Sequence, residues 1–86
     1  MIDKIKKLDP TILVADGFDD CIIGLTFRGD ELVALYSVDR IIDTLCNDNH
    51  MDVEDAYEYF EFNIAGAYMG PKTPMYLWGQ DVGSLD

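Results

Sequence analysis

The stretch CIIGLTFRGDELVALYSVDRIIDTLC, residues 21–46, decides the fold of this chain. It holds two apolar runs, 21–27 and 32–36, separated by the polar tetrapeptide RGDE. Two such runs about four residues apart predict a β-hairpin, and Gly29 can adopt the positive φ that a tight turn needs. Ser37 is suited to capping a helix. Apolar residues then follow at the spacing of one buried helical face: Val38, Ile41, Ile42, Leu45 and Cys46.

A second amphipathic helix is predicted after the polar turn NDNH, residues 47–50. Asp52 is suited to its N-cap, because a carboxylate accepts hydrogen bonds from the free backbone N–H groups of a first turn. Gly70 and Pro71 end the helix, unless Gly66 already frays it. The apolar spacing predicts a buried face made of Val53, Ala56, Tyr57, Phe60, Ile64 and Ala67.

The order of these elements predicts an α+β fold. Residues 73–78 suggest a last strand, and residues 1–8 a short amphipathic helix that ends before Pro10. We expect a small antiparallel sheet, formed by the hairpin and the C-terminal strand, with two helices packed on one face. A chain of 86 residues makes one domain. We place that domain at residues 1–78 and expect a loose C-terminal tail over 79–86.

The composition is typical of a folded protein rather than a disordered one. Apolar residues make up 49% of the chain, and none of their runs approaches the about 18 residues that a membrane span needs. The start, MIDKIKKLDP, lacks the apolar segment of a signal peptide. Cys21 and Cys46 lie in apolar patterns, and we interpret both as reduced core residues. We therefore expect a cytoplasmic protein.

The net charge of −11, from 17 acids and 6 bases, disfavours direct binding to nucleic acid or to an anionic membrane. It favours a basic protein partner. The alternative is that acidity only keeps a small protein in solution. Seven of the acids fall between Arg40 and Lys72, where the chain has no lysine or arginine. The two main helices therefore carry most of the negative field.

A helical wheel divides the aromatic residues of the second helix into two groups. Tyr57 and Phe60 fall on the core side, whereas Tyr59 and Phe62 fall near the opposite side. The second pair is either covered by the last strand, the N-terminal segment or a second subunit, or exposed as anchors of an interface. A homodimer would satisfy both interpretations. The candidate partner-binding residues are Tyr59, Phe62, Glu54, Asp55, Glu58 and Glu61.

The loop DGFDD, residues 16–20, holds the tightest cluster of carboxylates, and Asp16, Asp19 and Asp20 are weak candidates for a Mg²⁺ or Ca²⁺ site. Their spacing is not that of an EF-hand loop. The only histidine, His50, lies in a polar turn without a partner of any known catalytic motif. The glycines near residue 70 lack the lysine and the hydroxyl residue of a phosphate-binding loop. We predict no catalytic residues and no cofactor.

The chain resembles a family of small phage and prophage proteins over residues 15–77. The resemblance is carried by ADGFDDCIIG at 15–24, ALYSVDRIIDTL at 34–45 and MDVEDAYEYFEFNIAGAYMGPKTP at 51–74. That family has no assigned function, so the resemblance implies no catalytic residues. It implies an accessory protein made by a phage inside a bacterial host, and host takeover or counter-defence follows by association only.

These observations favour a non-enzymatic, acidic protein-binding module that inhibits or modulates a basic host protein, one that handles nucleic acid or serves in defence. Two other classes remain open. One is a binder of a small ligand, such as a nucleotide, in the cleft of a homodimer. The other is a metal-dependent enzyme that uses the DGFDD loop.

Overall fold

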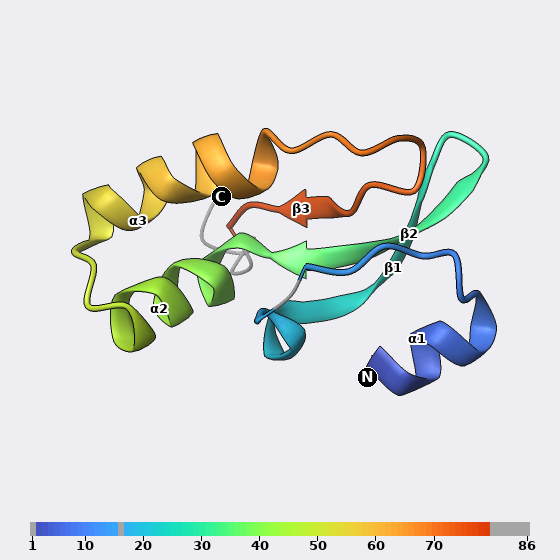
Figure 1. The fold of residues 1–86 in the computed structure, drawn as a ribbon, viewed down its shortest axis with the longest axis horizontal. Helices are drawn as coiled ribbons and strands as arrows, with labels where there is room; N and C mark the ends of the chain where they lie inside the picture. The colour runs from blue at the N-terminus through green and yellow to red at the C-terminus, as the bar shows by residue number, and fades with distance from the viewer. Residues whose placement is uncertain (1, 16, 80–86) are drawn as a thin grey trace.

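The computed structural model describes residues 2–15 and 17–79. It confirms the α+β class and the order of hairpin, two helices and strand (Figure 1). The predicted tail lies outside the described residues from residue 80 onward. The elements are α1 (Ile2–Leu8), a 3-10 turn (Asp19–Cys21), β1 (Ile22–Arg28), β2 (Glu31–Ser37), α2 (Val38–Asp48), α3 (Val53–Tyr59), a π-helical segment (Phe60–Ala65) and β3 (Met75–Leu77).

The three strands form a mixed sheet in the order β1-β2-β3. Strand β2 is antiparallel to β1 and parallel to β3, so the predicted antiparallel direction of the C-terminal strand was wrong. The physical reason is the connection between β2 and β3. Helix α2 continues away from the end of β2, α3 runs back, and the loop after α3 reaches the start of the sheet before β3 begins (Figure 1). Parallel strands need such a crossover.

The predicted hairpin turn is confirmed. Arg28 pairs with Glu31, which leaves Gly29 and Asp30 as a two-residue loop. Gly29 has a φ of 60°, and Asp30 is not among the residues with positive φ. A positive φ at the first loop position alone belongs to a type II′ turn, whose twist matches that of the flanking strands.

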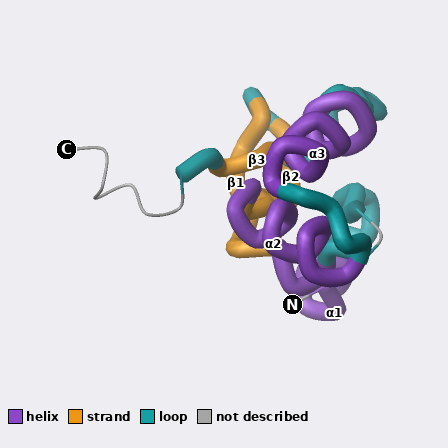
Figure 2. The backbone as a smooth tube through the Cα atoms, turned by 90° about the vertical axis from the view of Figure 1, so that its left-hand side faces the viewer, coloured by secondary structure: helices purple, strands orange, loops and turns teal. Residues whose placement is uncertain are grey.

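The hydrophobic core lies between the sheet and the helices. In Figure 2 the strands lie to the left of α1 and α3. Ile5 of α1, Tyr36 of β2, Leu45 of α2 and Phe60 after α3 are all buried in one cluster. The Tyr36 hydroxyl accepts a 2.7 Å hydrogen bond from the Ala15 backbone N–H, which holds the N-terminal segment against this core.

Both predicted helix caps are present. The Ser37 hydroxyl accepts a 3.3 Å hydrogen bond from the Arg40 N–H, and the Asp52 carboxylate accepts a 2.9 Å bond from the Asp55 N–H. Each bond satisfies a backbone donor that the first turn leaves free. These caps place the starts of α2 and α3 where the sequence predicted them.

The buried face of the second helix is shorter than predicted. Ala56 and Phe60 are buried and Tyr57 and Ile64 are half-buried, but Val53 is 58% exposed. Val53 lies in the first turn of α3, before the region that packs on the sheet. The helix ends at Ala65 with Gly66 as its C-cap, so the predicted end at Gly70 and Pro71 was wrong and the alternative end at Gly66 holds. Ala67 is therefore exposed in the following loop.

Candidate protein-binding surface

Helix α3 and the π-helical segment after it carry four exposed acids, Glu54, Asp55, Glu58 and Glu61. Within the described residues, no hydrogen bond or ion pair engages these four carboxylates. Lys72 forms ion pairs with Asp9 at 3.1 Å and with Glu31 at 3.0 Å, and neither involves α3. The carboxylates of α3 are therefore free to attract a positively charged group from outside.

Two aromatic side chains are exposed beside these acids. Tyr59 is 41% exposed and Phe62 is 76% exposed. Between them, Phe60 is buried against the C-terminal strand region. Its ring lies edge-on to the rings of Tyr76 at 5.3 Å and Trp78 at 5.5 Å between centroids. The last strand therefore covers Phe60 and leaves Tyr59 and Phe62 exposed. This agrees with the division of the aromatic residues by the helical wheel.

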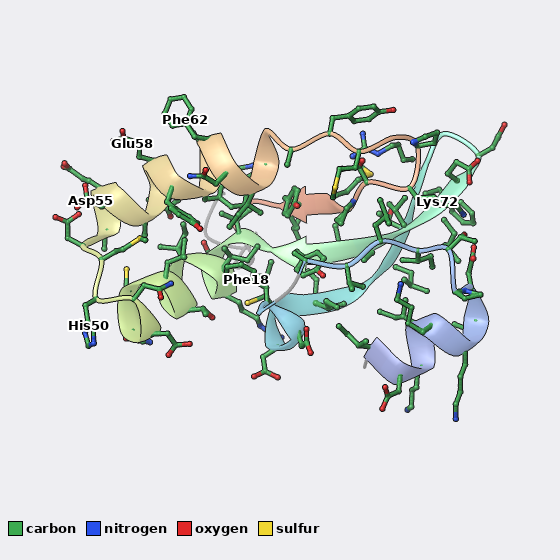
Figure 3. All side chains as sticks on the ribbon, viewed as in Figure 1. Phe18, His50, Asp55, Glu58, Phe62 and Lys72 are labelled. Carbon is green, nitrogen blue, oxygen red and sulfur yellow. The ribbon has the colours of Figure 1, made fainter. Side chains whose placement is uncertain are left out.

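The exposed rings border a shallow depression of about 370 Å³. In Figure 3, Asp55, Glu58 and Phe62 project from the side of α3 that faces away from the sheet. The depression is lined by Met51, Asp55, Glu58, Tyr59, Phe62 and Asn63. We call this set the α3 groove. Of the predicted partner-binding residues, four line the groove, whereas Glu54 and Glu61 lie outside its lining.

The sequence prediction missed Met51 and Asn63. Asn63 follows Tyr59 by four residues, and its amide donates a 3.3 Å hydrogen bond to the Tyr59 carbonyl. That spacing places two side chains on neighbouring helical turns, so it was a usable signal. Met51 precedes the Asp52 cap, and only the path of the chain between α2 and α3 brings it to the groove. A thioether beside exposed rings adds a soft apolar contact surface.

The chain continues α3 as a π-helical segment from Phe60 to Ala65. A π-helix closes hydrogen bonds from residue i to i+5, so successive side chains rotate less about its axis than in an α-helix. Phe62 and Asn63 project from this segment. Single π-helical turns inside helices are found frequently at functional sites, which makes the groove the natural place to look for a function.

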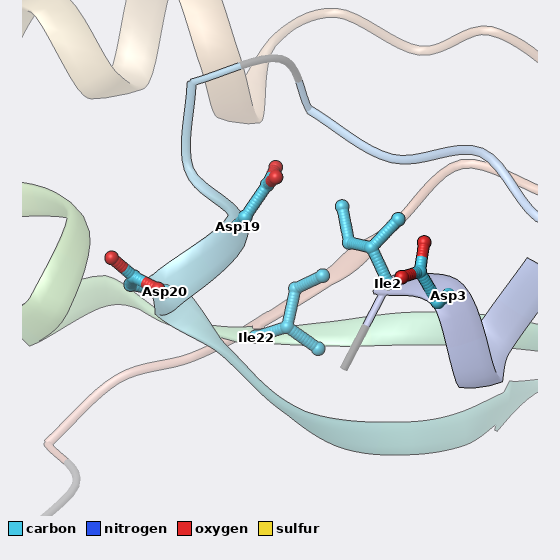
Figure 4. Close-up of a pocket in the computed structure, with 5 residues that line it drawn as sticks. All are labelled: Ile2, Asp3, Asp19, Asp20 and Ile22. Atoms are coloured by element: carbon cyan, nitrogen blue, oxygen red, sulfur yellow. The ribbon is translucent and has the colours of Figure 1, made fainter.

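The DGFDD loop places its acids differently. Asp19 and Asp20 are exposed on the 3-10 turn, and Asp16 lies outside the described residues. Figure 4 shows the Asp19 and Asp20 carboxylates pointing apart, with Asp3 across a hollow. That hollow has a volume of about 400 Å³. Among the described residues, no three histidine, cysteine or acidic side chains come together as a metal site.

The remaining reactive side chains do not line the groove. His50 lies in the turn between α2 and α3 with a φ of 57°, and its label in Figure 3 lies apart from Phe62. Cys21 and Cys46 are free thiols, Cys21 buried and Cys46 half-buried. Burial raises the pKa of the Cys21 thiol, although the Thr44 hydroxyl 3.5 Å away opposes that shift. A raised pKa keeps the thiol protonated and weakly nucleophilic.

No family model, no curated protein and no solved structure matches this chain. Within the described residues, no helix is long and apolar enough to cross a membrane. The geometry and the charge of the α3 groove are therefore the features that point to a function.

Proposed function

We propose that this protein is a non-enzymatic module that binds a basic protein partner through the α3 groove. The observation that carries the proposal is the combination of exposed rings and unpaired carboxylates on one helical surface. Tyr59 and Phe62 offer apolar contact area, and Asp55 and Glu58 line the same depression. Aromatic side chains are enriched among the residues that dominate binding energy, and charge complementarity increases the association rate.

Burial of carboxylates opposite lysine or arginine residues of a partner is favourable only when their charges are paired. A basic partner supplies that pairing, whereas an acidic or neutral partner would leave the acids of the groove desolvated and unpaired. The same field repels duplex nucleic acid and anionic membranes. We therefore propose a protein partner and no direct contact with nucleic acid or lipid.

The resemblance to small phage proteins supplies the biological setting of the proposal. In that setting the module acts in the cytosol of a bacterial host and inhibits or modulates a basic protein that handles nucleic acid or serves in defence. Such host proteins carry basic surfaces because they bind phosphate backbones. An acidic module that occupies such a surface would compete with the nucleic acid.

The experiment that tests this function is affinity capture from a bacterial host lysate with matched baits. The baits are the wild type, a variant with Tyr59→Ala and Phe62→Ala, and a variant with the exposed Val53→Ala change outside the groove. We expect a basic protein on the wild-type and Val53→Ala baits and its loss from the double variant. The captured protein is then purified and titrated at two salt concentrations. Equal capture by all three baits would contradict the proposal.

A further inference from the structure

Strand β1 is a long edge strand whose outer side is unpaired. The hairpin register shows which backbone groups of β1 point away from β2. In this register Arg28 pairs with Glu31 and Thr26 with Val33. In a two-residue hairpin these pairs are hydrogen-bonded, so the N–H and C=O groups of the intervening Leu25 and Phe27 point away from β2. Within residues 2–15 and 17–79, no backbone hydrogen bond outside the sheet engages Leu25 or Phe27.

Apart from a β-bulge at its start, between Ile22 and Gly24, this edge lacks the features by which proteins usually protect an open strand. Its sequence, IIGLTFR, has no proline, no acid and no lysine, all of which discourage pairing with another chain when placed on an edge. Its one charge is already engaged, because the Arg28 guanidinium donates to the Thr73 and Pro74 carbonyls at 3.3 and 3.1 Å. Phe27 is 65% exposed. The opposite edge is β3, which has only three residues.

The distribution of charge lets a second copy of this acidic chain approach β1. Two molecules of net charge −11 repel each other, but strand β1 contributes no carboxylate. Helix α3, which carries the free acids, is attached at the other side of the sheet, where Phe60 after α3 contacts Tyr76 of β3. Contact through β1 therefore keeps the two most acidic surfaces far apart.

We propose that β1 pairs antiparallel with β1 of a second copy, about a two-fold axis at Thr26, to form one continuous six-stranded sheet. In this register Leu25 of one copy lies opposite Phe27 of the other, and the two residues exchange their outward hydrogen bonds. Their side chains lie on the same face, where an aromatic and an aliphatic residue stabilise a cross-strand pair. The exposed Phe27 ring thereby gains a cover.

The proposed dimer does not rest on the proposed function, but it has a consequence for it. The α3 grooves would lie at opposite ends of the six-stranded sheet and would both stay open. A partner with two or more basic sites would then be held by two grooves, and the second contact would form at a raised effective concentration.

The salt dependence of the dimer separates it from partner binding. The two-fold register brings the hairpin turn with Asp30 toward the start of β1 in the second copy, which the exposed Asp20 carboxylate precedes. These like charges oppose pairing, and salt screens them. We expect dimer formation to strengthen as salt rises, whereas binding of a basic partner weakens. The two ideas can therefore fail independently.

The test is sedimentation equilibrium of the full chain from about 1 µM to 1 mM, the range in which weak association is measurable. We expect the mass to rise from one copy of 9.7 kDa toward two, more readily at high salt. Phe27→Lys should keep the protein monomeric with an unchanged thermal melt, because the ring it replaces is exposed. Val53→Lys adds the same charge on an exposed site of α3 and should leave the dimer intact.

A cysteine at the two-fold axis tests the register. Thr26→Cys, in a chain with Cys46→Ser, should form an intermolecular disulfide on mild oxidation, because facing residues of a non-hydrogen-bonded pair lie about 4.5 Å apart between Cα atoms, within disulfide range. Asp43→Cys, on the exposed side of α2, is the collision control. A wild type that stays monomeric at all concentrations and salts, or equal cross-linking of the two cysteine variants, would overturn the proposal.

Discussion

The Phe60 ring meets the Tyr76 ring edge-on, at an interplanar angle of 85° and a centroid distance of 5.3 Å. This contact joins the end of α3 to strand β3. It holds the Phe60 ring on the core side, whereas the Phe62 ring faces the other way. Phe60 contributes to the core, and Phe62, two residues later, is exposed. Edge-to-face pairs of this kind stabilise a fold beyond the area they bury.

Phe60→Ala should lower the free energy of unfolding by about 3–5 kcal/mol, because it removes a buried ring and leaves a cavity. Phe62→Ala removes an exposed ring and should change that free energy by less than about 0.5 kcal/mol. Chemical denaturation of both variants compares the two sides of the helix. Equal losses in dilute protein would mean that the assignment of the rings to core and surface is wrong.

Tyr59→Ala together with Phe62→Ala should weaken binding of the captured partner mainly through faster dissociation, because apolar anchors act once the complex has formed. Surface plasmon resonance or biolayer interferometry resolves the two rate constants. The control is Val53→Ala, which removes exposed apolar area from the same helix outside the groove. A double variant with wild-type kinetics would remove the aromatic residues from the interface.

Glu54→Gln, Glu58→Gln and Glu61→Gln in one chain should slow association and flatten its dependence on salt, since these charges act at long range before contact. Association rate constants measured at 50 and 500 mM salt give the slope of this salt dependence. Asp43→Asn with Asp48→Asn, on α2, removes two acids outside the groove lining, and the two variants are compared per charge removed. If the wild-type affinity does not change over this range, electrostatic recruitment is wrong.

Divalent cations and nucleotides test the two remaining function classes. If the DGFDD loop holds no metal, Mg²⁺, Ca²⁺ or Mn²⁺ should shift the melting temperature no more than a monovalent salt of equal ionic strength. Binding to the native state would raise the melting temperature by an amount that grows with the logarithm of ligand concentration over Kd. Tight binding of one ion that is lost in Asp16→Asn would favour the enzyme, and a rise with a nucleotide would favour the small-ligand binder.

The Asp9 carboxylate should make the fold sensitive to strong acid. Hydrogen bonds from the Thr11 hydroxyl and N–H, at 2.6 and 2.9 Å, and then the Lys72 ammonium lower the pKa of Asp9 from 3.8 to about 2. A lowered pKa in the folded state stabilises the fold above pH 3.8, and this stabilisation is lost as the pH falls toward 2. Denaturation of the wild type and Asp9→Asn between pH 2 and 6 measures it. Asp9→Asn should lose less stability than the wild type over this window. Parallel curves of unfolding free energy against pH would contradict the lowered pKa of Asp9.

Local signals in the sequence determined the hairpin and the helix starts. The RGDE tetrapeptide, the Ser37 and Asp52 caps and the spacing of the α2 face depend on residues close together in the chain, so short-range geometry suffices to read them. The division of Phe60 from Phe62 is of the same kind, because a helical wheel needs only the angle between neighbouring residues.

Only the tertiary structure decided how distant segments meet. The direction of β3 depends on the path of the whole connection through α2 and α3, and the α3 groove needs Met51 to approach from the preceding turn. Arg28 reaches the Thr73 carbonyl 45 residues away, and Lys72 joins Asp9 to Glu31. Such contacts join groups that are far apart in the sequence, since only packing of the whole chain brings them together. Local propensity therefore predicts the elements, but burial and long-range pairing decide their direction, their ends and the surface they leave exposed.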